Sequence, residues 1–230
     1  MVQLFSECWR PYLHLVTDVL QQLLAPAGIY EKKRPQKTRQ LEALDGSKKY
    51  SHLLTGQPCP GRFKVQENGL NYLVDLERDL NTGLFFDQRE NRRSLARMIG
   101  GKTFLNLFAY TGAFSVTAAA AEAKKVTSVD ASSRYLDWAK ENFAANRLNP
   151  KRHEFIDDDC FAALDRFIRE GRSFDVILFD PPSFSTTRKS TFSTRGGTTE
   201  LVAKTAELLT AGGLLIGSTD HQKSELSDYL

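Results

Sequence analysis

Hydrophobic positions recur at a helical period near the start of the chain. Between residues 10 and 25, apolar side chains follow one another at intervals of three and four residues, and Pro26 comes directly after. These positions are Leu13, Val16, Val19, Leu20, Leu23 and Leu24. The spacing predicts one amphipathic helix that ends before the proline.

A polar segment and then a hairpin pattern follow this helix. Residues 31–60 are polar and basic and contain Gly56, Pro58 and Pro60, so we expect a loop with little regular structure. Two alternating runs, 63–67 and 70–75, then flank Asn68-Gly69, which is the most specific short signal for a β-hairpin. The sequence therefore predicts a small α+β region over residues 1–80.

From residue 81 onwards, strand-like and helix-like runs alternate. We expect helices at 89–98, 113–121, 134–146, 160–169 and 200–209. We expect strands at 103–108, 126–130, 153–158, 175–180 and 213–218. Such alternation predicts an α/β fold with a doubly wound, mostly parallel sheet over residues 81–230. The run Val176–Phe179 is continuously apolar, as in a strand that is buried on both faces.

Composition narrows the class of protein. The chain has 230 residues, 41% of them hydrophobic and 26% charged, which is a globular composition. It has no apolar run of about 18 residues, so no transmembrane helix is expected. Its first residues, Met1–Glu7, lack a basic stretch followed by an apolar core, so we expect no secretory signal. Its cysteines, Cys8, Cys59 and Cys160, form no C-x-x-C pair, and its four histidines show no ligand spacing. We therefore expect no disulfide, no metal site and a reducing cytoplasm as the location.

Basic residues gather in three stretches, although the formal net charge is only +3. The stretches span residues 32–39, 89–97 and 188–195. A single basic run is often no more than a solvated face, but three runs beside a candidate site favour a polyanionic partner. The expected contacts to such a partner are Lys32, Lys33, Arg34, Arg92, Arg188 and Lys189.

Candidate ligand-binding residues follow the first three strands of the predicted parallel sheet. Ligands of open α/β sheets bind outside the carboxyl ends of the strands. The first strand is followed by Phe108–Gly112, which has one glycine where a dinucleotide fingerprint has three, so a ligand without phosphate, such as S-adenosylmethionine, suits it better. Asp130 ends the next strand, where an acid binds both ribose hydroxyls, although this feature alone does not exclude NAD. Asp159 and Cys160 follow the third strand and are expected beside an adenine.

The fourth strand ends in Asp180-Pro181-Pro182-Ser183-Phe184. Two prolines after an aspartate fix a rigid turn that cannot extend the sheet. A carboxylate and rigid carbonyls then point into the crevice, and Phe184 offers a face on which a base can stack. We therefore expect Asp180, Pro181 and Phe184 to act in catalysis.

These motifs together resemble those of bacterial 23S ribosomal RNA methyltransferases. The motifs are Thr82–Arg92, Leu105–Gly112, Ser128–Asp130, Tyr135–Ala139 and Asp180–Phe184. The group includes a 5-methylcytosine enzyme and the 7-methylguanine half of a bifunctional guanine methyltransferase. The resemblance covers about residues 28–220 and implies a class I, Rossmann-like S-adenosylmethionine-dependent methyltransferase. It implies a donor site lined by Phe108, Tyr110, Gly112, Asp130, Asp159 and Asp180 and closed by Asp87 and Arg89.

The target atom depends on nucleophilic chemistry. Cytosine C5 requires a cysteine thiolate that adds to the ring, and the segment Ile216–Asp220, where such a cysteine would follow the fifth strand, has none. Guanine N7 has an exposed lone pair and needs no catalytic base, so we prefer guanine N7, with the exocyclic N2 amine second.

Other hypotheses remain open on the sequence. They are a cytosine-C5 enzyme, a methyltransferase that acts on a small molecule or protein, an NAD-dependent oxidoreductase, and a catalytically impaired RNA-binding homologue. The last is included because class I methyltransferases normally complete the sheet with two further strands. The sequence shows no sixth or seventh strand, which predicts a sheet without its C-terminal strands.

Overall fold

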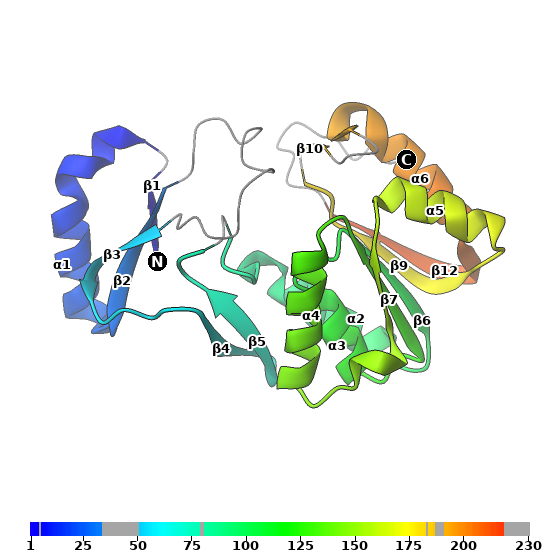
Figure 1. Ribbon diagram of the computed structural model, residues 1–230, viewed down its shortest axis with the longest axis horizontal. Coiled ribbons are helices and arrows are strands. Elements are labelled where there is room, and N and C mark those ends of the chain that lie inside the picture. The colour runs from blue at the N-terminus through cyan, green and yellow to red at the C-terminus, as the bar shows by residue number, and fades with distance from the viewer. Residues whose placement is uncertain (5, 34–50, 79–80, 183, 187–190, 219–230) are drawn as a thin grey trace. The chain divides into compact units, whose positions relative to one another are not determined.

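The computed structural model describes the chain except for residues 5, 34–50, 79–80, 183, 187–190 and 219–230 (Figure 1). The chain divides into two compact units. The first unit comprises Met1–Val65 and Leu73–Phe85, and the second comprises Gln66–Tyr72 and Phe86–Leu230. The division passes through the predicted hairpin, whose turn belongs to the second unit.

The first unit contains a three-stranded sheet of order β1-β2-β3. Its strands are β1 (Val2–Leu4), β2 (Gly28–Lys33) and β3 (Ser51–Gly56). The predicted N-terminal helix is confirmed as α1 (Leu13–Leu24), preceded by the 3-10 helix η1 (Glu7–Tyr12).

The prediction of an irregular loop over residues 31–60 was wrong at both ends, because β2 continues to Lys33 and β3 begins at Ser51. The polar composition hid β2 because its Glu31 is fully buried. The Arg10 guanidinium, 2.9 Å away, compensates the charge of Glu31, and the His52 imidazole lies 3.0 Å from the same carboxylate. Buried charges are tolerated when they are paired in this way.

The hairpin prediction is confirmed by β4 (Arg62–Glu67) and β5 (Leu70–Asp75). Asn68 and Gly69 have φ of +50° and +81°, the backbone conformation that a type I′ turn requires. This is why the Asn-Gly pair identified the turn from sequence.

The second unit is built on a five-stranded sheet of order β12-β9-β6-β7-β8, in which every neighbouring pair is parallel. The strands are β6 (Thr103–Leu107), β7 (Lys125–Asp130), β8 (Glu154–Asp157), β9 (Phe174–Phe179) and β12 (Leu209–Gly217). The predicted doubly wound α/β fold is confirmed, with each expected strand within a few residues of its observed bounds.

Helices cover both faces of this sheet (Figure 1). They are α2 (Arg89–Met98), α3 (Ala113–Ala120), α4 (Ser133–Ala145), α5 (Cys160–Arg169) and α6 (Thr194–Glu207). Ile177 and Phe179 of β9 pack in the core with α5 and α6, whereas Val176 and Leu178 pack in the core with α2 and α3. The continuous apolar run of β9 is therefore explained by burial on both faces.

Two local features differ from the sequence-based expectation. A short antiparallel pair, β10 (Phe184–Thr186) with β11 (Thr191–Ser193), follows the Asp-Pro-Pro turn. Helix α6 begins at Thr194 rather than near residue 200, through Gly196 and Gly197, which are poor helix formers. In the part of the chain that the structure describes, no helix is both long and apolar enough to cross a bilayer.

Candidate functional site

The carboxyl ends of four neighbouring strands lie in register in the second unit. Leu107 pairs with both Val129 and Phe179, and Phe179 pairs with Gly217. The residues that follow these positions, Phe108, Asp130, Asp180 and Ser218, therefore lie along one edge of the sheet. From β6 the chain adds β7 and then β8 on one side of the sheet. It then adds β9 and β12 on the other side of β6, so the direction in which strands are added reverses between β6 and β9. Ligands of open α/β sheets bind at this topological switch point.

Asp130 connects the loop between β6 and α3 with the loop between β7 and α4 at this edge of the sheet. The backbone N–H of Tyr110 donates to Asp130 Oδ2 at 2.8 Å, and the backbone N–H of Ser132 donates to Oδ1 at 2.9 Å. The β6–α3 loop is tightly wound, since Phe108 and Tyr110 have φ of +56° and +50°, which is uncommon for residues other than glycine. A carboxylate oxygen has two lone pairs, so each oxygen of Asp130 keeps one acceptor position for a ligand hydroxyl.

Burial changes the proton affinity of Asp130. Desolvation raises the pKa of its carboxyl group to about 6, against the lowering effect of the two backbone N–H donors, and the nearby Asp157 carboxylate raises it further. Asp130 therefore changes from neutral to ionised near pH 6, and it is an acceptor for several hydrogen bonds at neutral pH.

Gly112 makes room for a neighbouring helix beside the loop. It is the N-cap of α3 with φ of +72°, and a Cβ built on it would lie 2.6 Å from the Cβ of Ala139 on α4. The missing side chain thus allows α4 to approach the loop.

A Gly112→Ala variant is expected to lose more stability than a Gly101→Ala variant. Gly101 has a similar φ of +71° but open space around its missing Cβ, so its substitution measures only the cost of the backbone conformation, about 1–2 kcal/mol. The contact with Ala139 adds an overpacking cost of about 1–3 kcal/mol at Gly112. Urea denaturation measures both variants, and adding Ala139→Gly should recover the difference. Equal losses for the two single variants would contradict the packing explanation.

Asp159 and Cys160 begin α5 beside this edge. Oδ1 of Asp159 accepts from the backbone N–H groups of Phe161 (3.0 Å) and Ala162 (3.2 Å), so Asp159 is the N-cap of the helix. Cys160 is 4% exposed, and its Sγ accepts from the backbone N–H of Phe108 at 3.4 Å. Burial raises the pKa of the Cys160 thiol well above its ordinary value. Both residues position the loops of the site, and their contact with an adenine remains a prediction.

The segment before α2 reaches the other end of the same edge. Asp87 lies in the 3-10 helix η3 (Phe86–Gln88) and Arg89 begins α2, and both are exposed. The side chain of Gln88 donates from Nε2 to Ser218 Oγ at 3.1 Å. This bond holds η3 next to the carboxyl end of β12. Gln88 was within the quoted Thr82–Arg92 motif, but only the fold shows its partner.

The Asp-Pro-Pro turn follows β9 as expected. Asp180 is partly exposed, Pro181 is buried and Pro182 is exposed. Ser183 and the side chain of Phe184 lie outside the described part of the structure, so the stacking role of Phe184 remains a prediction.

The expected basic contacts need correction. Arg92 is 2% exposed and forms a bidentate pair with Glu67 (2.7 and 2.8 Å), and Lys32 is also only 2% exposed. Burial removes both from the surface, where a phosphate would have to reach them. The side chain of Lys33 and residues Arg34, Arg188 and Lys189 lie outside the described part of the structure.

The arginines of α2 lie on two different faces of the helix. Arg92 faces the core, whereas Arg89, Arg93 and Arg97 of the same helix are exposed. The helical period of α2 could have shown this, because Arg92 lies three residues before the buried Leu95 and therefore on the same face.

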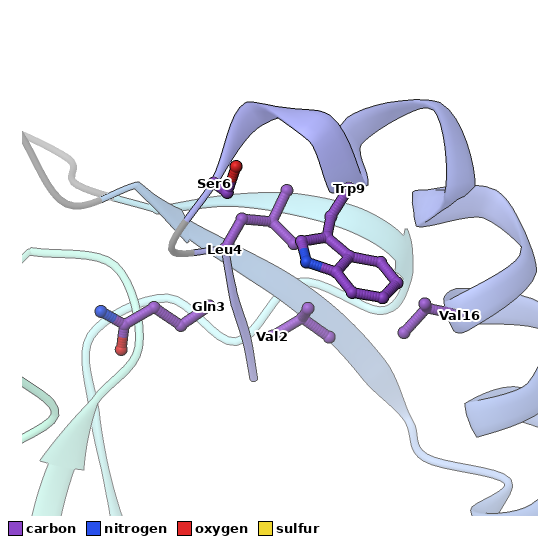
Figure 2. Close-up of a pocket in the computed structure, with 6 residues that line it drawn as sticks. All are labelled: Val2, Gln3, Leu4, Ser6, Trp9 and Val16. Carbon is purple, nitrogen blue, oxygen red and sulfur yellow. The ribbon is translucent and has the colours of Figure 1, made fainter.

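A cavity of about 250 Å³ lies in the first unit, with a mainly apolar lining (Figure 2). It is lined by Val2, Gln3, Leu4, Ser6, Trp9 and Val16. It contains none of the residues predicted for the site. Among the described residues, no group of three histidines, cysteines or acids is arranged to hold a metal ion.

The sheet order and the acid at its edge define a class I methyltransferase fold, and solved structures agree. A putative methyltransferase complexed with SAH, SMU.776, superposes with a TM-score of 0.88 at 33% identity over 99% of this chain and 57% of that one. A putative SAM-dependent methyltransferase from Streptococcus mutans gives a TM-score of 0.85 at 32% identity over 99% and 56% of the chains.

The family follows from the sequence comparison. The model of the S-adenosylmethionine-dependent methyltransferase family matches residues 1–226, and the chain belongs to this family. This confirms the class that the motifs implied and excludes the NAD-dependent oxidoreductase.

The names of curated relatives refer to ribosomal RNA. The chain is 40% identical to ribosomal RNA large subunit methyltransferase K of Neisseria meningitidis over 73% of its length and 48% of the relative. It is 38% identical to methyltransferase K/L of Chromohalobacter salexigens, over 90% of this chain and 27% of the relative. It is 35% identical to the putative large subunit methyltransferase YwbD of Bacillus subtilis, over 96% and 54%. The chain thus spans about half or less of the length of these relatives.

Proposed function

We propose that the second unit binds S-adenosylmethionine at the carboxyl edge of its sheet and that the protein methylates a guanine base of 23S ribosomal RNA. The observation that carries the proposal is Asp130, a partly exposed acid at the switch point whose two backbone donors leave one acceptor position on each oxygen. The names of the relatives support ribosomal RNA as the substrate.

The residues of the site fit the methyl donor. Asp130 would accept hydrogen bonds from both ribose hydroxyls, and the turn Phe108–Gly112 would lie against the amino acid part. Asp87 and Arg89 would close the site from η3 and α2, while Asp159 and Cys160 would flank the adenine. When bound, the donor supplies an already activated methyl group, so the protein has mainly to orient two reactants. Asp180 and the Pro181 carbonyl would hold the acceptor base, and Phe184 would stack on it.

The target atom is proposed to be guanine N7, with N2 second. A cytosine-C5 reaction needs an accessible thiolate, but Cys160 is buried and its thiol has a raised pKa. Cys8 and Cys59 lie outside the parallel sheet that carries the proposed site. Guanine N7 needs only orientation and a donor. The proposed substrate also places the protein in the cytoplasm.

Two measurements test the proposal. Isothermal titration should show that the protein binds S-adenosylmethionine, and lack of binding would refute the donor site. Incubation with labelled donor and unmodified 23S ribosomal RNA, followed by nucleoside analysis, should place the label on guanine. Label on cytosine, or label only on protein or small molecules, would overturn the choice of substrate.

A Cys160→Ala variant separates the two base chemistries further. We expect methyl transfer at saturating donor within about threefold of the wild type, because the thiol makes only weak hydrogen bonds and alanine still fills the place proposed beside the adenine. Single-turnover transfer and donor affinity are measured on the same preparation. A variant that binds the donor normally but transfers no methyl group would instead identify Cys160 as a nucleophile.

A further inference from the structure

A chain of amide hydrogen bonds connects the β4–β5 turn with the β6–α3 loop inside the second unit. Asn71, at the start of β5, donates from its backbone N–H to Asn146 Oδ1 at 2.8 Å. Asn146, the C-cap of α4, donates from Nδ2 to the carbonyl oxygens of Asn71 (2.7 Å) and Asn142 (2.8 Å). Asn142, one turn earlier on α4, donates from Nδ2 to the carbonyl of Thr111 at 2.9 Å.

The hydrogen bond from Asn142 to Thr111 lies at a tightly wound part of the β6–α3 loop. Thr111 lies between Tyr110 and Gly112, which both have positive φ, and both Thr111 and Asn142 are fully buried. A buried carbonyl needs a donor, and removing a donor from it costs free energy. The Asn142 amide therefore fixes the Thr111–Gly112 peptide, one residue after Tyr110, whose N–H is bonded to Asp130.

We propose that Asn142 is a positioning residue of the methyl-donor site, acting through the Thr111 carbonyl, and that Asn146 and Asn71 connect this support to the hairpin turn. The proposal rests on the proposed donor binding at the β6–α3 loop. Asn142 itself touches no reacting atom. Its effect is to keep the loop in the conformation in which Tyr110 and Asp130 face the donor.

The alternative is that Asn142 only stabilises the fold. A matched control distinguishes the two roles, because Ile99 is also fully buried in the second unit but lies at the amino end of β6, before Thr103. Ile99→Val and Ile99→Ala give graded losses of stability, so one of them can be matched to Asn142→Ala in urea denaturation. Asn146→Ala, at a partly exposed position, breaks the chain one step further from the loop and provides a folded variant if Asn142→Ala does not fold.

The experiment combines calorimetric titration with S-adenosylmethionine and hydrogen exchange of the Tyr110 amide. Asn142→Ala is expected to weaken donor binding by about tenfold, the effect of one hydrogen bond to a buried carbonyl. Asn146→Ala should weaken it by about twofold to fivefold. The kcat at saturating donor should change less than KM, and Tyr110 should lose exchange protection. The matched Ile99 variant should keep the wild-type affinity and protection.

Two outcomes overturn the inference in distinguishable ways. If Asn142→Ala and the matched Ile99 variant have the same donor affinity and the same Tyr110 protection, Asn142 is only a structural residue. If the wild type binds no donor, the proposed function fails, and the exchange measurement alone still decides whether Asn142 fixes the loop.

Discussion

An Asp130→Asn variant is expected to bind S-adenosylmethionine about 100-fold more weakly than the wild type. Asparagine keeps one acceptor oxygen but places an NH₂ group against one of the two backbone N–H groups that the carboxylate now binds. It also removes the negative charge from the two hydrogen bonds proposed to the ribose. Hydrogen bonds to charged groups contribute about 1.5–3 kcal/mol each, and 1.4 kcal/mol corresponds to about tenfold in affinity.

The pH dependence of donor binding provides a second signature of Asp130. Burial raises the pKa of its carboxyl group from 3.8 to about 6, so the ionised form that accepts all four hydrogen bonds dominates only above pH 6. Donor affinity should therefore fall as the pH decreases from 7 to 5. Calorimetric titration across this range should show a midpoint near pH 6 in the wild type, whereas Asp130→Asn should show none.

The stability of the protein without donor should change with pH in the opposite direction. A carboxyl group whose pKa is raised on folding contributes stability below its unfolded pKa and loses it as the pH rises through the folded value. The contribution of Asp130 to the free energy of unfolding should thus disappear between about pH 4 and pH 6. Donor binding compensates above this range, so the stabilisation by S-adenosylmethionine in thermal denaturation should increase with pH.

Asp157→Asn is the matched control for these measurements. Asp157 pairs in register with Asp130 on the adjacent strand β8, is exposed and raises the pKa of Asp130. Its substitution should leave donor affinity at pH 8 within about twofold and move the midpoint of the pH profile to a lower pH. An Asp130→Asn variant with wild-type affinity would refute the ribose assignment.

An Arg92→Met variant is expected to destabilise the second unit by about 3–5 kcal/mol, since it leaves the carboxylate of Glu67 buried without a partner. The pair is 2% and 6% exposed at the side-chain level, and the guanidinium also lies 5.7 Å from the centre of the Phe114 ring. Urea denaturation measures the loss. Trp138 is fully buried in the second unit, so its fluorescence reports this unit in a Trp9→Phe background.

A double-mutant cycle separates the pair from the packing around it. Arg92→Met with Glu67→Leu replaces both charges by apolar groups and should be less destabilised than Arg92→Met alone. Arg93 is the matched control, because it is 55% exposed on the same helix and its substitution by methionine should cost less than about 0.5 kcal/mol. Equal effects of Arg92→Met and Arg93→Met would contradict the assignment of Arg92 to the core.

The alternation of strands and helices after residue 81 was sufficient to predict the α/β fold. Parallel strands are buried on both faces and require helical connections, so both leave clear patterns in sequence, as Val176–Phe179 and the helices at 89–98 and 160–169 show. The Asn68-Gly69 turn was equally readable, because only a few residues adopt two positive φ values in succession.

Long-range pairing determined the features that the sequence did not reveal. β2 and β3 were hidden because their strands are stabilised by each other and by the buried Glu31 pairs, rather than by their own apolar pattern. The burial of Arg92 has the same origin, since its charge on a buried face depends on Glu67, which lies 25 residues away in the sequence.

For the site, the sequence by itself determined which residues follow the strand ends: Phe108, Asp130 and Asp180. Register and sheet order are fixed by the fold, and only they place these residues along one edge at a switch point. Tertiary structure also decided that Gly112 makes room for Ala139, that Asp159 caps α5 and that Asn142 reaches the Thr111 carbonyl. Local sequence specifies backbone conformation over a few residues, whereas these contacts exist only after distant elements have packed together.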